Sequence, residues 1–267
     1  MMSATTSSKG SAERWGPLWS ARPQDWAATE EQQLPTYEAA IRRAGIGASQ
    51  RVLEVGCGSG VFLRAAADRG ARVAGLDASA ALIDLARARV PEAELSVGDM
   101  QFLPYPDDTF DAAAGFNAFF FAADMAAAVR EAARVTKPGA PVIIQVWGRS
   151  ERCDLTAMKN ALATLVPAPE PNAPRPPALW EPGVLEGIAT QAELSPKEVF
   201  DVSWAYEFPD ETSLTRAMLA PGLIIDLIRA AGEEAVRGAI VQSLAPYRSS
   251  AGGYRLENEW HTLLAAA

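Results

Sequence analysis

Short apolar segments alternate with helical patterns between residues 51 and 147, and this alternation constrains the fold more than any other feature of the sequence. Strands are predicted at 51–55, 71–77, 93–99, 110–116 and 141–147. Helices are predicted between them at 61–70, 78–90 and 121–135. Strands separated by helices of this length form βαβ units, which build a parallel sheet with helices on both faces. We therefore expect a doubly wound α/β fold.

The flanking segments add further helices and two more strands. Residues 1–12 are polar and predict a disordered tail. Pro23 and Pro35 favour helix starts, which gives helices at about 24–33 and 35–44. The C-terminal elements are predicted as helices at 154–166 and 181–194, a Pro-rich loop at 167–177, strands at 199–208 and 252–266, and helical patterning over 210–245 with a break at Pro221–Gly222. The sheet should therefore be seven-stranded and mostly parallel.

Composition excludes several classes of function. The 267-residue chain has a formal net charge of −9, which argues against a nucleic-acid partner, because phosphate binding needs a basic face. Its two cysteines, Cys57 and Cys153, form no CxxC pair, and it has one histidine, so we expect no metal site and no disulfide framework. The sequence shows no secretory signal and no apolar run near ~20 residues. We expect a cytoplasmic protein without a membrane span.

The segment VLEVGCGSG at 52–60 carries the main chemical signal. Gly56, Gly58 and Gly60 follow a strand and open a helix, which allows a sharp turn and a close approach of a ligand to the backbone. The dinucleotide fingerprint would require glycine at position 61, where this chain has Val61. Glu54 would repel a pyrophosphate but suits a ligand with an ammonium and a sulfonium group. These features disfavour a nicotinamide-dependent oxidoreductase.

Two more carboxylates follow at the ends of the next two predicted strands. Asp77 ends the second strand, where its carboxylate can accept both hydroxyls of a ribose. Asp99 ends the third predicted strand, where it can accept an adenine amino group while the backbone of Met100 meets the ring edge. All these positions converge on the carboxyl edge of the sheet, where ligands bind in this architecture.

The chain resembles the class I S-adenosylmethionine-dependent methyltransferases, in particular the branch similar to ubiquinone- and menaquinone-biosynthesis methyltransferases. The resemblance rests on VLEVGCGSG, VAGLDAS, VGDMQFLPYPDDTFD and EAARVTKPGAPVII, and it covers about residues 35–150 well. It implies S-adenosylmethionine as cofactor and S-adenosylhomocysteine as product. It also implies N-terminal helices that fold over the cofactor and a helical lid before the last strand.

These expectations define one domain at 13–267. Its parts are N-terminal helices at 13–45, a cofactor-binding core at 46–150, and a C-terminal part at 151–267 with the lid at about 210–250. The residues expected beside the cofactor are Trp19, Glu54, Gly56, Cys57, Gly58, Gly60, Asp77, Ala78, Asp99, Met100, Gln101 and Phe116. Cys57 is expected there as a small residue that fits the loop and not as a reactive thiol.

The acceptor side is less defined by the sequence. Members of the resembled family often carry a polar pair after the fourth strand, whereas this chain has the run Phe119–Phe121, which contributes either to the core or to an apolar acceptor pocket. Asn117 is a candidate catalytic residue that orients the ligands, and loop capping is its alternative role. His261 is a candidate base, and a structural hydrogen bond is its alternative role.

The sequence thus predicts methyl transfer to a small, apolar or aromatic acceptor at oxygen, carbon or nitrogen. Proximity and in-line orientation of the two reactants would drive such a reaction. The alternative is a catalytically inactive S-adenosylmethionine-binding module or partner subunit. A homodimer is a further possibility that the sequence leaves open.

Overall fold

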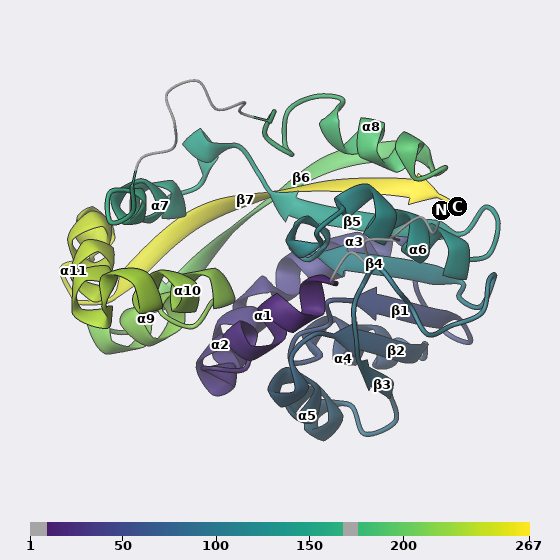
Figure 1. Cartoon of the computed structure of the whole chain (residues 1–267), viewed down its shortest axis with the longest axis horizontal. Helices are drawn as coiled ribbons and strands as arrows, with labels where there is room; N and C mark the ends of the chain where they lie inside the picture. The colour runs from purple at the N-terminus through teal and green to yellow at the C-terminus, as the bar shows by residue number, and fades with distance from the viewer. Residues whose placement is uncertain (1–9, 168–175) are drawn as a thin grey trace, which may run out of the picture.

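The computed structural model describes residues 10–167 and 176–267 and has the expected doubly wound α/β architecture (Figure 1). One seven-stranded sheet has the order β3-β2-β1-β4-β5-β7-β6. The first five strands are parallel, and β7 runs antiparallel to both of its neighbours. The strands are β1 Arg51–Val55, β2 Arg72–Asp77, β3 Glu94–Val97, β4 Ala112–Phe116, β5 Pro141–Trp147, β6 Ser195–Phe208 and β7 Tyr254–Ala266. The predicted mostly parallel, seven-stranded sheet is confirmed.

Helices surround this sheet, and several begin at residues whose side chains cap them. Ser79, Asp124 and Asp210 each accept a hydrogen bond from a backbone N–H in the first turn of the helix that follows. The α-helices are α1 Ser11–Trp19, α2 Pro23–Glu30, α3 Leu34–Ala44, α4 Val61–Ala67, α5 Ala80–Arg89, α6 Met125–Val135, α7 Leu155–Ala163, α8 Val184–Gln191, α9 Glu211–Met218, α10 Gly222–Ala231 and α11 Glu233–Leu244. Short 3₁₀ helices are η1 Glu31–Gln33, η2 Phe119–Phe121, η3 Ser150–Arg152 and η4 Ala245–Tyr247.

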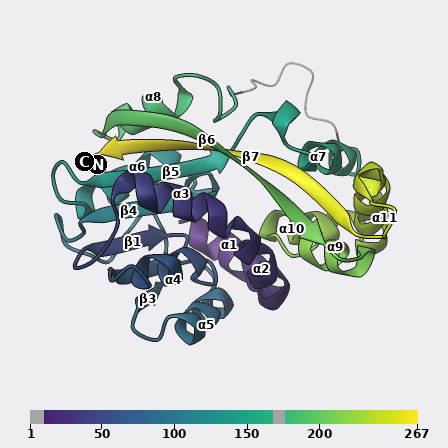
Figure 2. The same ribbon diagram turned by 180° about the vertical axis from the view of Figure 1, so that it is seen from behind.

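The two faces of the sheet are covered by different helices. Helices α3, α4 and α5 cover one face, where Tyr37, Ile41 and Phe62 pack on the strands (Figure 2). Helices α6 and α8 cover the other face, where Val135 and Leu185 are fully buried. Apolar side chains on both sides of the central strands explain why these strands are continuously apolar in sequence.

Strands β6 and β7 extend beyond the rest of the sheet and carry a group of helices. β5 pairs with β7 only from Trp260 onward, so residues 254–259 of β7 pair with β6 alone. Helices α7, α9, α10 and α11 lie along this extension (Figure 1). Their side chains form a separate apolar core with the fully buried Trp260. Helices α1 and α2 lie between this group and the parallel strands, since α1 contacts α5 and α10 and α2 contacts α5 and α9.

Helix α1 differs from the sequence prediction, which placed a disordered tail up to residue 12. The helix begins at Ser11, and residues 1–9 lie outside the described part of the chain. Non-local contacts hold α1, because Ser11 and Ala12 donate to Asp99, and Gly16 lies so close to Ala78 that a Cβ would come within 2.5 Å of its carbonyl oxygen. Pro17 inside the helix weakens the local signal that could have revealed it.

Some predicted boundaries also shift. β3 ends at Val97 and not at Asp99, because the chain turns at Asp99, whose carbonyl and carboxylate oxygens accept the N–H groups of Phe102 and Gln101. The helix predicted from residue 121 begins at Met125, where Asp124 caps it, and residues 119–121 form η2 instead. The predicted Pro-rich loop at 167–177 lies mostly outside the described residues.

Within residues 10–167 and 176–267, none of the helices combines the length and the apolar character needed to cross a bilayer. The same ranges contain no group of three or more histidine, cysteine, aspartate or glutamate side chains arranged to hold a metal ion.

Candidate active site

A cavity of about 620 Å³ opens at the carboxyl edge of the parallel strands. One half is bounded by the glycine-rich turn after β1, the end of β2 and helices α1 and α2. The other half is bounded by the end of β5, β6, α7, α9 and α10. A volume of this size lies within the usual range of small-molecule sites and has room for two molecules side by side.

The glycine-rich turn requires glycine because of its backbone conformation and because neighbouring atoms leave no room for a side chain. Gly56, Gly58 and Gly60 have φ values of 74°, 50° and 82°, in the left-handed region that favours glycine. A Cβ on Gly56 would lie 2.5 Å from the Cβ of Ala118, and one on Gly58 would lie 2.7 Å from Glu30 Oε2. Gly56 and Gly58 also line the cavity, so the turn presents bare backbone to a ligand.

Asp77 stands at the end of β2, as predicted, and lines the cavity. Its two carboxylate oxygens accept backbone hydrogen bonds from Gly58 and Ser79 at 2.9 and 2.8 Å. Burial raises the pKa of Asp77, and these N–H donors oppose that shift. Each oxygen keeps a lone pair, so the carboxylate can still accept hydroxyl groups of a ligand.

Asp99 and Met100 line the same half of the cavity, but Asp99 already has partners from the protein. Its carboxylate accepts hydrogen bonds from the Ala12 and Gln101 N–H groups, at 2.7 and 2.9 Å. The Ser11 hydroxyl adds a further contact at 3.2 Å. Asp99 therefore ties the first turn of α1 to the loop that follows β3.

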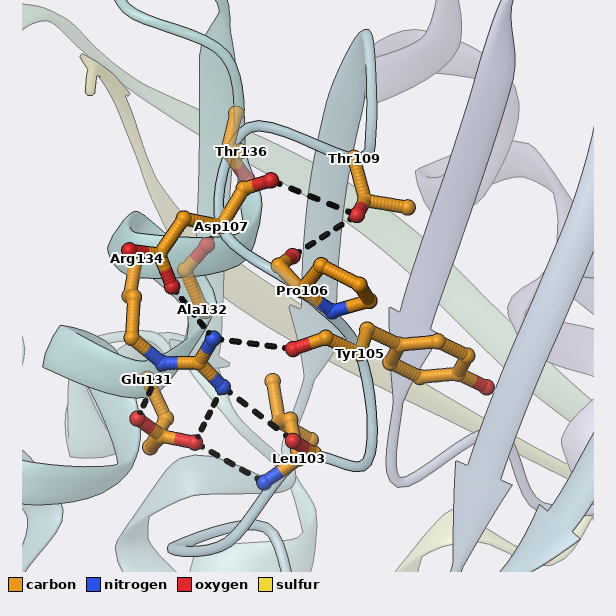
Figure 3. Close-up of polar contacts among 9 residues, drawn as sticks. All are labelled: Leu103, Tyr105, Pro106, Asp107, Thr109, Glu131, Ala132, Arg134 and Thr136. Carbon is orange, nitrogen blue, oxygen red and sulfur yellow. Dashed lines mark hydrogen bonds and ion pairs between the residues drawn. The ribbon is translucent and has the colours of Figure 1, made fainter.

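Arg134 on α6 fixes the far end of that loop (Figure 3). Its guanidinium donates to the carbonyl oxygens of Leu103 and Tyr105 and to the carboxylates of Asp107 and Glu131. Glu131 in turn accepts the Leu103 N–H at 2.9 Å. These contacts immobilise residues 103–107, and through them the segment that carries Asp99 and Met100.

The sequence suggested Glu54 as the carboxylate for a cationic ligand, but Glu30 lines the cavity in its place. Glu54 is buried on β1, does not line the cavity, and its Oε2 has no hydrogen-bond partner within the described residues. Burial, followed by the charges of Glu30 and Asp77, raises its pKa well above the ordinary value. Glu30, which the sequence reasoning missed, lines the cavity from the last residue of α2.

Glu30 contacts the glycine-rich turn directly. Its Oε2 accepts the Ser59 N–H at 2.8 Å. Burial raises the pKa of this carboxyl group from 4.5 to about 7, while hydrogen bonds from Ser59 and the charge of Arg89 lower it. A glutamate in the polar last turn of α2 gives no sequence signal that separates it from a solvated glutamate, so only the fold reveals this residue.

The second half of the cavity is largely aromatic and apolar. Trp147 lines it and stacks on the buried Trp260 at 5.3 Å between ring centroids. Tyr206, Trp180 and Phe121 line it as well. Further apolar contacts come from Met158, Leu179, Met218, Pro221, Leu223 and Ile224. Lys159 is the one basic side chain among the described residues of the lining.

The phenylalanine run is divided between the two roles that the sequence left open. Phe119 is 1% exposed and packs on Gly115, where an added Cβ would come within 2.3 Å of its ring. Phe120 and Phe121 line the cavity. Phe121 makes edge contacts with Trp15 and Trp19 of α1, at 4.8 and 5.5 Å between ring centroids.

The two candidate catalytic residues lie in different places. Asn117 lines the cavity just after β4 with φ of 50°, and its buried Oδ1 has no partner within the described residues. Its Nδ2 reaches Gln33 Oε1 at 3.5 Å. His261 does not line the cavity, and its Nδ1 lies 2.7 Å from Asp201 Oδ1 on the neighbouring strand. This contact supports the structural alternative for His261.

The residues that the sequence predicts beside the cofactor divide into those that line the cavity and those that do not. The cavity lining includes Trp19, Gly56, Gly58, Asp77, Ala78, Asp99, Met100 and Phe116. It does not include Glu54, Cys57, Gly60 and Gln101, which lie behind or beside these residues. Cys57 is fully buried, and burial raises the pKa of its thiol, which keeps the group protonated and unreactive.

Comparisons with known proteins agree with this geometry. Residues 53–144 match the family described as a methyltransferase domain. An uncharacterised protein of Mycobacterium tuberculosis is 34% identical over 157 residues, which are 57% of this chain and 56% of that protein. The ubiquinone biosynthesis O-methyltransferase of Alkalilimnicola ehrlichii is 36% identical over 117 residues, or 42% of this chain and 47% of that enzyme. The chain thus spans about half the length of the curated relatives that it matches.

The solved structure of a protein from Bacillus halodurans, described as a putative methyltransferase, has a similar fold. The TM-score is 0.58 at 17% sequence identity, and the alignment covers 87% of this chain and 98% of that one. At this identity the likeness establishes the fold alone, and it includes the C-terminal half that the family match does not reach.

Proposed function

We propose that the chain is a class I S-adenosylmethionine-dependent methyltransferase that transfers a methyl group to a small apolar or aromatic acceptor, as the methyltransferase-domain match at residues 53–144 supports. The observation that carries this proposal is the single cavity that joins the glycine-rich turn to the aromatic half. Donor and acceptor would lie in these two parts, with the reacting atoms between them. The net charge of −9 supports a small molecule over a nucleic acid as acceptor.

The residues of the first half fit the donor. Gly56 and Gly58 present backbone to it, and the Asp77 carboxylate has lone pairs for its ribose hydroxyls. Met100 supplies apolar surface for its adenine ring. When bound, S-adenosylmethionine supplies a sulfonium methyl group that is already activated for in-line displacement. The protein therefore needs mainly to align the acceptor and to keep water out.

Asn117 would orient the acceptor. It follows β4 and lines the cavity, and its buried Oδ1 has no partner among the described residues, so it can accept a hydrogen bond from a hydroxyl or amino group. The aromatic walls of the second half exclude water and hold a flat ring by stacking. Met218, Leu223 and Ile224 support the assignment of α9 and α10 as the lid over the acceptor.

A transfer assay with methyl-labelled S-adenosylmethionine tests the proposal. The acceptor panel should contain phenols and quinols, aliphatic amines, fatty acids and a transfer RNA. Labelled product with aromatic members supports the proposal, and product with RNA alone would overturn the acceptor class. Donor binding without turnover across a broad panel would favour the non-catalytic alternative.

Substitution at Trp147 tests the aromatic half. Trp147→Ala removes one wall of the acceptor part, so KM for an aromatic acceptor should rise about tenfold or more while the Kd for the donor stays unchanged. Trp204→Ala is the matched control, because Trp204 is 47% exposed on β6 outside this cavity. Equal effects of the two substitutions would contradict the assignment of this half.

A further inference from the structure

Three carboxyl groups are buried around the glycine-rich turn. Glu30, Glu54 and Asp77 are 3%, 1% and 9% exposed, and they come from α2, β1 and β2. Burial is the main cause that raises the pKa of each of the three groups. In addition, the charges of Glu30 and Asp77 raise the pKa of Glu54, and the charge of Asp77 raises that of Glu30. Buried acids without a matching cation are costly, so their grouping indicates a ligand that carries positive charge.

Arg89 is the basic side chain whose charge acts on Glu30, but its hydrogen bonds go to other residues. The Arg89 guanidinium on α5 donates to Ser59 Oγ at 3.1 Å and to Glu31 Oε1 at 2.6 Å. It lowers the pKa of Glu30 through its charge but makes no hydrogen bond to it. The carboxyl group of Glu30 is therefore only partly compensated within the protein.

Glu30 is the member of the group best placed to meet a ligand. Both of its oxygens lie within 3 Å of the position that a Cβ on Gly58 would occupy, and Gly58 lines the cavity as Glu30 does. It is also the last residue of α2, where the helix dipole disfavours a negative charge. Its position costs stability, and among the described residues the only positive charge that offsets that cost is that of Arg89, without a direct ion pair, which is typical of a residue kept for binding.

The other titratable groups around Glu30 are Glu54 on β1, Asp77 on β2, Cys57 in the turn, Tyr37 on α3, Tyr206 on β6 and Arg89 on α5. Arg89 is the one cation among them, and its hydrogen bonds go to Ser59 and Glu31. Burial raises the pKa of Tyr37, Tyr206 and Cys57, so these three groups stay neutral near pH 7. Glu30 and Asp77 are the two acids of this group that line the cavity, and burial raises the pKa of Glu30 to about 7, so its charge can change near neutral pH.

We propose that Glu30 is the counter-charge for the sulfonium group of the methyl donor, so that its carboxyl group releases a proton to solvent when the donor binds. This inference rests on the proposed function. S-adenosylmethionine carries one more positive charge than S-adenosylhomocysteine, because the sulfonium becomes a neutral thioether. Glu30 therefore makes the site favour the donor over the product, and it couples donor binding to pH.

Isothermal titration of the whole protein with S-adenosylmethionine, in two buffers of different ionisation enthalpy, tests the proposal. For a group that titrates near pH 7, binding should release about half a proton at pH 7. Donor affinity should rise about tenfold between about pH 6 and pH 8. Glu30→Gln keeps the size of the side chain and should abolish both the proton release and the pH dependence.

S-adenosylhomocysteine and a surface variant serve as controls. Glu30→Gln should weaken the donor about tenfold at pH 8 and leave the product nearly unaffected, so that the preference for the donor is lost. Glu38→Gln, on the solvent side of α3, should behave as the wild type, since Glu38 pairs with Arg42 and Arg69 away from the cavity.

The outcomes separate this inference from the proposed function. Donor binding without proton release, or with equal pH dependence in wild type and Glu30→Gln, would overturn the role of Glu30 and leave the methyltransferase assignment intact. No donor binding by the wild type at any pH would overturn both.

Discussion

Two single residues beside the glycine-rich turn, Glu30 and Glu54, are buried acids that cost the folded protein stability. Glu30 and Glu54 are glutamates in positions where an apolar side chain would pack without an electrostatic penalty. The sequence pointed to Glu54, because it lies in the motif, and missed Glu30, which reaches the turn from a helix 29 residues before Ser59. A motif identifies residues close together in the chain, whereas the second carboxylate depends on how α2 packs.

The stability of the unliganded protein should reveal the cost of Glu30. An acid whose pKa rises from 4.5 to about 7 on folding keeps its proton in the native state while the unfolded chain loses it. Stability therefore falls as the pH rises from about 4.5 to 7, and the penalty is constant above that range. Glu30→Gln should raise the free energy of unfolding by up to about 3 kcal/mol at pH 8, and by little near pH 4.5.

Urea unfolding of both proteins at the two pH values checks this prediction. A variant that is destabilised equally at both pH values would show that the Ser59 hydrogen bond matters more than the buried charge.

Among the structural elements, the loop between β3 and β4 depends on α6 for its shape. Arg134 holds two carbonyl oxygens and two carboxylates at once, which a lysine cannot reproduce with a single ammonium group (Figure 3). Arg134→Lys should therefore lower stability by about 2 kcal/mol and weaken donor binding several-fold, because the loop also carries Asp99 and Met100.

Chemical unfolding and donor titration of Arg134→Lys measure the two effects. Arg130→Lys on the same helix is the control, since Arg130 donates to a single carbonyl oxygen, that of Gln191. Unchanged donor affinity in Arg134→Lys would show that the start of the loop is fixed independently of α6.

Helix α1 closes the first half of the cavity, and its contacts are almost all non-local. Ser11 and Ala12 reach Asp99, while Trp15 and Trp19 meet Phe121 and line the cavity. Removal of residues 1–20 should weaken donor binding at least about tenfold, because Asp99 and the donor half would then face solvent. Circular dichroism should show a folded protein, and a donor affinity equal to that of the full chain would contradict the role of α1.

At the scale of the whole molecule, the elements of both halves could be predicted from sequence, but the way the extension of β6 and β7 carries its helices back to the cavity could not. The five parallel strands have local signals, namely apolar runs, glycine turns and helix stops such as Gly45. The acceptor half arises where β6 and β7 run past β5 and bring α7, α9 and α10 back to the cavity. That arrangement follows from strand pairing between residues about 50 positions apart, which no local pattern encodes.

Under the proposed function, this division would separate the donor from the acceptor. The half proposed for the donor presents backbone and carboxylate groups, while the half proposed for the acceptor presents mainly aromatic and apolar side chains. Substrate choice in this chain should therefore depend on the aromatic residues of β5, β6 and the helices that cover them.

The central claim is that the glycine-rich turn and Asp77 bind S-adenosylmethionine, and isothermal titration of wild type and Asp77→Ala tests it most directly. The wild type should bind at micromolar concentration, and Asp77→Ala should bind at least about tenfold more weakly, a loss of about 1.4 kcal/mol. Asp84→Ala, on the exposed side of α5, should bind as the wild type does. Absence of binding to the wild type, or equal binding by Asp77→Ala, would contradict the account.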